Sequence, residues 1–307
     1  MARAPQGGLS PAPGIAVNSD TPLTDAALPL EEPVSGSGEA PPAESLLAYP
    51  ATYALLAVNV VVFLLMLRLG SGPILVAIRN HEWAQLFTAP FDNRTLIRFG
   101  ASDASMVLGG EWWRLVTAMF VHVTLLHILL NMWCLWNLGL FGEPLLGKQG
   151  LFAVYLLTGA AGMIASLGWA VLMTLLTGTP HDIATAGASG AIFGIAGILI
   201  ILLSNRKLSL PWDELRDLRR MVIFFAVANL VIGIGPDLLA RFAKGVPRID
   251  NTAHVGGFVC GLALGLPLFP RMTSARSSYR ARQRWTFAVA TLVLCLITYA
   301  IQAGAKG

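Results

Sequence analysis

Long apolar runs alternate with short polar loops along most of the chain, and the runs are long enough to cross a bilayer. About 20 predominantly apolar residues span the hydrocarbon core of a membrane. The pattern predicts seven spans, at residues 50–68, 118–141, 151–174, 186–204, 221–240, 253–270 and 285–303. The expected fold class is therefore an all-α polytopic membrane protein.

Two segments lie outside this pattern. The amino-terminal segment 1–47 is rich in Pro, Gly, Ser and Ala and carries several acids, which predicts a disordered tail. The segment 69–117 is amphipathic and aromatic, so a partly embedded loop is expected there. The expected organisation is a tail over 1–47, a membrane core over 48–272, and a linker with the seventh helix over 273–307.

Composition and charge support the membrane interpretation and suggest an orientation. Hydrophobic residues make up 55% of the chain and charged residues 12%, whereas about 25% charged residues is usual for soluble domains. The net charge of +4 does not indicate nucleic acid, because the basic residues cluster in short loops between spans. Their distribution predicts a cytoplasmic amino terminus, in what we expect to be a bacterial plasma (inner) membrane, although Arg68 and the acidic tail argue against that orientation.

Four polar side chains from three spans are expected at one depth. With ~1.5 Å of rise per residue, Ser189 lies ~22 Å above the inner end of its span. His254 and His127 lie ~24 Å above theirs, and Asn131 lies ~18 Å above its own. Polar groups inside apolar spans are costly and are usually functional, so this layer predicts a site.

The residue types in this layer suit acyl transfer. A serine hydroxyl is a weak nucleophile until a base such as histidine takes its proton. His127 and Asn131 share one helix face and, with the backbone N–H of Ser189, could donate hydrogen bonds to an oxyanion. Glycines at four-residue spacing would let the spans of Ser189 and His254 approach closely; they are Gly190, Gly194, Gly257 and Gly261.

Three motifs together resemble the rhomboid intramembrane serine proteases. They are "GASG" at 187–190, "AHVGGFVCG" at 253–261 and "HVTLLHILLN" at 122–131, and the resemblance covers roughly 105–270. It implies a rhomboid-like six-helix bundle, here with one extra carboxyl-terminal helix, and a dyad of Ser189 and His254. It further implies that His127 and Asn131 support the oxyanion, beside Gly187 of the serine motif.

Three more positions match the family. Arg114, in "EWWR", matches its structural arginine, and Glu143 matches a glutamate at the foot of the second span. Phe193 stands where the family has an aromatic residue beside the catalytic histidine, and as phenylalanine it can stack but cannot hydrogen-bond. The expected function is an endopeptidase that cuts the transmembrane helices of single-pass membrane proteins in a lipid environment.

Several alternatives remain open at this stage. A catalytically silent relative that binds membrane clients would share the fold. Asp250, four residues before His254, could orient the imidazole and make a triad. Neither a cofactor nor a metal is expected, since the histidines lack an HExxH pattern or a suitable carboxylate beside them. A transporter would need an inverted repeat or an ionisable relay, which the spans do not display.

Overall fold

The computed structural model describes residues 48–181, 184–208, 211–239, 250–271 and 273–306, and within them the regular structure is helical. The expected tail over 1–47 lies outside the described residues. The long helices are α1 (Pro50–Leu69), α7 (Leu125–Thr177), α8 (Ser189–Leu202), α9 (Trp212–Leu239), α10 (Asn251–Leu268) and α11 (Arg276–Lys306). Within the described ranges, four of them (α1, α7, α10 and α11) are long and apolar enough to cross a membrane, and α8 is a shorter apolar helix.

The helix α7 contains two of the predicted spans. Its backbone leaves the helical region at Gly147, where φ is +71°, a conformation that glycine adopts without steric cost. The chain therefore turns there, between the expected spans 118–141 and 151–174. The number of seven spans stays a prediction.

Three helices begin at residues other than the starts of the predicted spans. The second span was expected from residue 118, but α7 begins at Leu125, where the Thr124 side chain accepts a hydrogen bond from the His127 amide at 3.1 Å. The helices α9 and α11 begin nine residues earlier than the expected 221 and 285. Arginine and glutamate are good helix formers, so these helices continue beyond the apolar stretch that hydropathy detects.

Short helices fill the segment between α1 and α7, where an embedded loop was expected. They are α2 (Pro73–Arg79), α3 (Trp83–Leu86), α4 (Asn93–Arg98), α5 (Ala104–Leu108), α6 (Arg114–Thr117) and the 3₁₀ turn η1 (Ala118–Phe120). Arg114 ties this segment together: its guanidinium donates to Glu111 at 2.8 Å, to the Ile97 carbonyl at 2.7 Å and to the Ala101 carbonyl at 3.0 Å.

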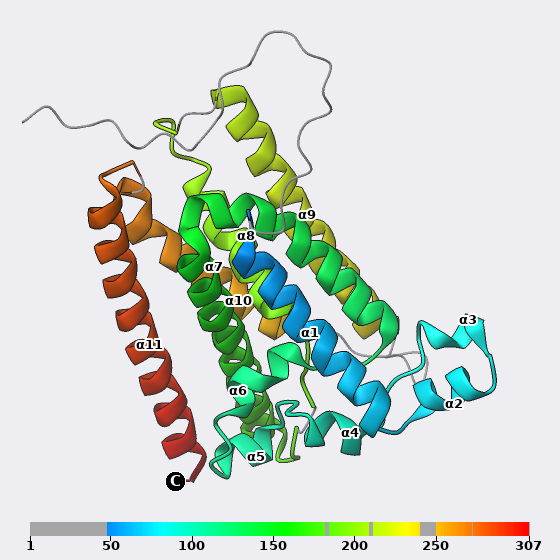
Figure 1. Ribbon diagram of the computed structural model, residues 1–307. Coiled ribbons are helices and arrows are strands. Elements are labelled where there is room, and N and C mark those ends of the chain that lie inside the picture. Colours follow the sequence, from blue (N-terminus) through cyan, green and yellow to red (C-terminus); the bar gives the residue numbers. More distant parts are fainter. Residues whose placement is uncertain (1–47, 182–183, 209–210, 240–249, 272, 307) are drawn as a thin grey trace, which may run out of the picture.

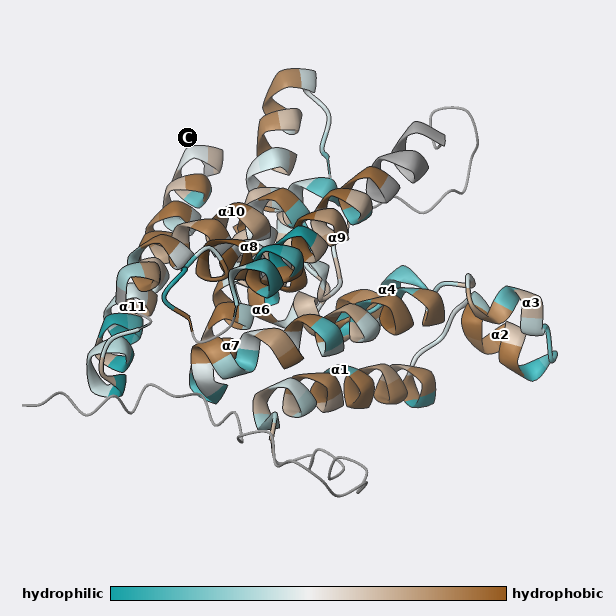
Figure 2. Cartoon of the chain, turned by 90° about the horizontal axis from the view of Figure 1, so that it is seen from above, coloured by the Kyte–Doolittle hydropathy of each residue, from teal (hydrophilic) through white to brown (hydrophobic). Residues whose placement is uncertain are grey.

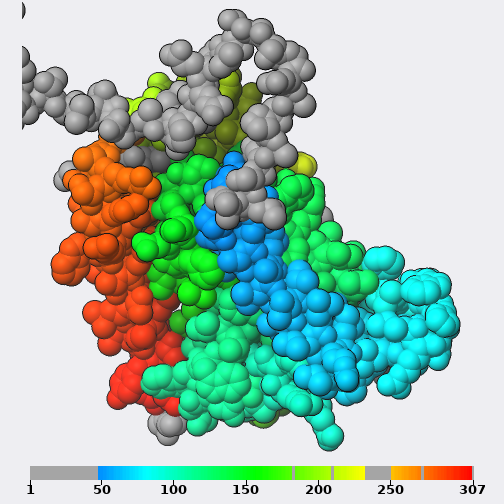
Figure 3. Space-filling view, viewed as in Figure 1, coloured from blue at the N-terminus to red at the C-terminus, as the bar shows by residue number. Residues whose placement is uncertain are grey.

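The helix α8 lies at the centre of the bundle and is buried along almost its whole length. The helices α7, α9 and α10 pack against it, and α1 packs on α7 (Figure 1). The helix α11 runs along one flank of the molecule (Figures 1 and 3). Hydrophobic residues predominate on α1 and α9 (Figure 2). Their outward side chains, such as Leu64 at 56% and Phe224 at 74% exposure, suit contact with lipid.

Glu143 anchors α1 to α7. Its carboxylate accepts hydrogen bonds from the Ala51 amide at 2.9 Å, the Thr52 amide at 2.8 Å and the Thr52 hydroxyl at 2.8 Å. These amides belong to the first turn of α1, where N–H groups lack partners within the helix and attract negative charge. The buried glutamate is thus held by the amino-terminal end of another helix.

Candidate active site

Ser189 and His254 meet at the amino-terminal ends of α8 and α10. Ser189 is the first residue of α8, and its Oγ lies 2.7 Å from Nε2 of His254, in the first turn of α10. If the hydroxyl donates, Nε2 is the acceptor and the neutral ring carries its proton on Nδ1. That Nδ1 is buried and has no hydrogen-bond partner among the described residues, so the contact is a pair rather than a chain of three groups.

Glycines bring the two helices together. A Cβ atom at Gly257 would collide with the carbonyl oxygen of Gly190, and one at Gly261 would collide with that of Gly194. On the other side of α8, a Cβ at Gly194 would collide with the side chain of Thr158 in α7. We call the contact of α8 with α10 along these four glycines the glycine seam. Small residues at such a seam allow helix backbones to approach within a membrane.

Phe193 packs on the imidazole of His254. The two rings are stacked, with centroids 4.5 Å apart and planes 12° from parallel. Phe193 lies one turn after Ser189, so one helix of the seam supplies both the hydroxyl and the surface that restricts rotation of the ring. This is the position that the sequence predicted for it.

His127 lies beside the serine segment. Its ring atoms Cε1 and Nε2 are 2.8 Å from the place that a Cβ of residue 187 would occupy, and Gly187 has a φ of +131°. Only glycine fits both requirements without strain. His127 Nδ1 accepts from the Val123 amide at 3.5 Å, which leaves Nε2 to carry the proton of the neutral ring toward the serine segment.

Asn131 lies one turn further along α7. Its Nδ2 donates to the His127 carbonyl at 2.9 Å, within its own helix. An amide nitrogen has two hydrogens, so one remains for another acceptor. Among the described residues Asn131 makes no side-chain hydrogen bond to Ser189. His122 lies just before α7 and is fully buried. Its ring meets the His127 ring edge-on, with centroids 5.1 Å apart.

A family model described as the Rhomboid domain matches residues 109–271, more than half of the chain. The chain belongs to the rhomboid family. Relatives include Rhomboid protease GluP of Bacillus subtilis (strain 168), 35% identical over 181 residues, which are 57% of this chain and 31% of that protein. RHOMBOID-like protein 5 of Arabidopsis thaliana is 31% identical over 178 residues, covering 58% of this chain and 50% of that protein.

Rhomboid protease AarA of Providencia stuartii aligns over a larger share of its length than these two relatives do. The two chains are 30% identical over 200 residues, which cover 63% of this chain and 69% of that protein. By contrast, the chain spans 31% and 50% of the lengths of the first two relatives. Family membership and the apolar helices together identify this rhomboid as a multi-pass integral membrane protein.

Asp250, which the sequence left as a possible third member of a triad, caps a helix in this rhomboid. Asp250 caps α10 by accepting from the Ala253 amide at 3.1 Å, and it also accepts from the hydroxyls of Ser166 and, at 3.0 Å, Thr185. It does not hydrogen-bond to the His254 ring, whose Nδ1 has no partner among the described residues. Asp250 therefore joins the start of α10 to α7 and to the segment before Ser189.

The sequence analysis missed the partners of Asp250. Thr185 pairs through its backbone with Ser102, by hydrogen bonds of 2.7 and 2.9 Å, in an isolated antiparallel bridge. Ser166 lies in the second half of α7. A hydroxyl at membrane depth in each of two neighbouring segments was the available signal, since such groups need hydrogen-bond partners. Within the described ranges, no three His, Cys, Asp or Glu side chains are grouped as a metal site would require.

Proposed function

We propose that this rhomboid protein is an intramembrane serine endopeptidase in which Ser189 is the nucleophile and His254 the base. The observation that carries the proposal is the 2.7 Å contact between Ser189 Oγ and His254 Nε2 inside a helix bundle. It is supported by relatives that are themselves named rhomboid proteases.

The proposed reaction begins when Ser189 Oγ attacks the carbonyl carbon of the scissile peptide and passes its proton to His254 Nε2. The negative charge then moves to the carbonyl oxygen, where the Ser189 amide at the start of α8, His127 Nε2 and the free amide hydrogen of Asn131 would stabilise it. The imidazolium gives its proton to the leaving amine, and the C–N bond breaks. Water, deprotonated by the same histidine, hydrolyses the acyl-enzyme and restores the hydroxyl.

The substrates proposed are single-pass membrane proteins cut within or beside their spanning helix. A helical amide already uses its carbonyl in a hydrogen bond, so the substrate must unwind near the scissile bond. Residues that weaken a helix there, such as glycine or proline, should favour cleavage. The proposed setting is a bacterial inner membrane with the amino terminus in the cytoplasm, following the arginine-rich ends of α9 and α11.

The proposal is tested by co-expressing the full chain with a single-pass model substrate. Ser189→Ala and His254→Ala should each abolish cleavage and labelling by a serine-reactive fluorophosphonate. The matched controls, Ser277→Ala and His81→Ala, alter an exposed serine and an exposed histidine elsewhere and should retain both. Wild-type cleavage by either site variant would exclude the dyad. If the unaltered protein neither labels nor cuts but still binds the substrate, the catalytically silent alternative is correct.

Asn131→Ala tests the proposed oxyanion support separately. Losing one such donor lowers the rate on the order of 10-fold to 1000-fold in other acyl-transfer enzymes. The expected result is slower cleavage of the model substrate, with substrate binding retained. Unchanged turnover would remove Asn131 from the proposed mechanism and leave the dyad in place.

A further inference from the structure

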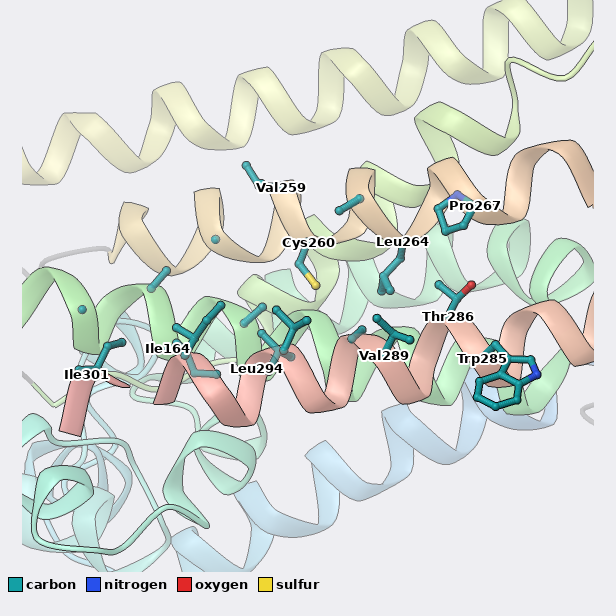
Figure 4. A pocket seen from close by; sticks show the side chains of 18 of the residues that line it. Ile164, Val259, Cys260, Leu264, Pro267, Trp285, Thr286, Val289, Leu294 and Ile301 are labelled. Atoms are coloured by element: carbon teal, nitrogen blue, oxygen red, sulfur yellow. The ribbon is translucent and has the colours of Figure 1, made fainter. Parts of the chain in front are cut away.

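A groove separates α11 from the rest of the bundle. It has a volume of about 730 Å³, and α7, α10 and α11 line it (Figure 4). Hydrogen bonds hold α11 near both ends: Gln283 donates to the Leu146 carbonyl and Gln302 to the Leu108 carbonyl, each at 2.9 Å. Between these two positions the opposing wall includes several small residues, namely Ala161, Ala165, Gly168, Gly256 and Ala263. Fixed ends and small residues in this wall together leave room for the groove.

The groove is about as long as a membrane is thick. From Arg282 to Ile301, both of which line it, α11 rises ~28 Å, close to the ~30 Å hydrocarbon core. A bilayer has two leaflets, so an acyl chain that starts at one end of the groove reaches about halfway along it.

One end of the groove is polar and the remainder is apolar. Arg282, Trp285 and Thr286, three residues on one face of the first turns of α11, line that end and could offer a guanidinium, an indole N–H and a hydroxyl. Figure 4 shows Trp285 and Thr286 near Pro267 at this end and Ile301 at the other. The walls between them include Leu264, Val289 and Leu294. An apolar pocket with a few convergent polar groups is typical of a small-molecule site.

The charge at this end has one sign. Four exposed arginines, Arg276, Arg280, Arg282 and Arg284, lie in the first turns of α11, and none forms a salt bridge among the described residues. The sequence has no Asp or Glu from residue 271 to 307. Basic residues at a membrane surface attract anionic headgroups. The charge selects a negatively charged occupant for the polar end.

We infer that the groove between α11 and α7–α10 is a binding site for an anionic phospholipid, with its phosphate at Arg282 and an acyl chain along Val289 and Leu264. The arginine supplies a charge-assisted hydrogen bond, and the indole and hydroxyl could contact the phosphate or the glycerol esters. The apolar side chains of the groove would surround one acyl chain of this lipid in place of other lipid molecules. This site is separate from Ser189 and His254 and does not depend on catalysis.

The test uses the purified full-length chain in phosphatidylcholine nanodiscs. A trace of phosphatidylglycerol with a photoreactive diazirine on its acyl chain is added, and crosslinked peptides are mapped by mass spectrometry. We expect crosslinks to the stretches 259–264 and 289–294, competed by unlabelled phosphatidylglycerol and poorly by phosphatidylcholine. The same diazirine on phosphatidylcholine should label these stretches much less. Equal labelling by the two probes, or no labelling of the groove, would overturn the proposal.

Three variants locate the headgroup and the chain. Arg282→Gln should lower the crosslink yield about fivefold, the loss expected for one basic residue at a membrane surface. Arg276→Gln is the matched control, since it removes a charge that does not line the groove. Ala263→Phe keeps the charges but fills the apolar wall, and should remove the crosslinks. Thermal unfolding reports whether each variant folds. An unaltered yield in Arg282→Gln and Ala263→Phe would exclude the lipid site.

Discussion

The contact of α8 with α10 and the contact of α11 with the bundle are two helix packings in the same membrane, built in opposite ways. At the glycine seam, backbones touch and leave no room for a Cβ atom. Along α11 most side chains are exposed, and of its described residues only Gln283 and Thr298 are buried. The difference shows that this fold concentrates close packing where Ser189 and His254 meet, and leaves a looser contact along α11.

The largest effect should come from placing the same methyl group in both contacts. In Gly257→Ala the new Cβ collides with a backbone carbonyl, which cannot rotate away, so α8 and α10 must separate. Overpacking of this kind costs about 1–3 kcal/mol, and separation breaks the contact of Ser189 with His254. We expect fluorophosphonate labelling of Ser189 to fall at least about 100-fold, since each 1.4 kcal/mol is about tenfold and the geometry is also lost.

Gly168→Ala is the matched control on the groove side. Its Cβ would meet only the Cδ1 atom of Ile301, at an ordinary 3.6 Å. Labelling and the melting temperature should stay close to those of the unaltered chain. If Gly257→Ala labels as fast as Gly168→Ala, the seam does not position the site, and the contrast between the two packings has no functional meaning.

A smaller effect is expected from Asp250, which holds the seam at its amino-terminal end. Asp250→Ala removes the cap of α10 and the acceptor for Ser166 and Thr185. Loss of a cap costs typically ~1 kcal/mol, and the freed hydroxyls add to it. We expect labelling of Ser189 to slow about tenfold, together with a lower melting temperature.

Asp250→Asn separates positioning from charge. Asparagine caps helices about as well as aspartate through its one carbonyl oxygen, and its Nδ2 can donate to the Ser166 and Thr185 hydroxyls in place of the carboxylate oxygen that accepts from them, so it should label at nearly the original rate. In enzymes with a true triad the corresponding change costs about 10⁴-fold. A loss of that size, with an unaltered melting temperature, would show that the carboxylate acts on the imidazole after all.

The sequence could reveal the site more readily than its surroundings. Helix rise is fixed, so counting residues from the span ends was enough to put Ser189 and His254 at one depth, and the glycine spacing predicted the close approach. The partners of Glu143 and Asp250 could not be found in this way. They lie 91 and 92 residues from Glu143, and 65 and 84 from Asp250, and such distant pairs are set by tertiary packing. Hydropathy likewise missed the starts of α9 and α11, because charged helical turns outside lipid have no apolar signal.

Phe193 tests the seam at the level of one ring. Phe193→Ala removes the surface stacked on His254, and such aromatic pairs contribute about 0.5–1.5 kcal/mol beyond their buried area. Labelling should slow about threefold to tenfold. Phe225→Ala is the control, since Phe225 touches Phe193 at a centroid distance of 6.4 Å but is not the ring stacked on the imidazole. Equal slowing in both variants would mean that the labelling rate depends on general side-chain packing in the bundle and not on the stacking of Phe193 on His254.

The smallest effect on the site should come from loosening α11. Gln283→Leu removes the donor to the Leu146 carbonyl, which lies next to the turn at Gly147. A net hydrogen bond contributes about 0.5–1.5 kcal/mol, so a modest fall in melting temperature is expected, with labelling of Ser189 unchanged. The contact of Ser189 with His254 depends on the packing of α8 against α10. The Gln283 hydrogen bond links α11 to α7 and is not part of that packing. A loss of labelling as large as that in Gly257→Ala would show that α11 holds the seam closed, and the two packings would then be one cooperative unit.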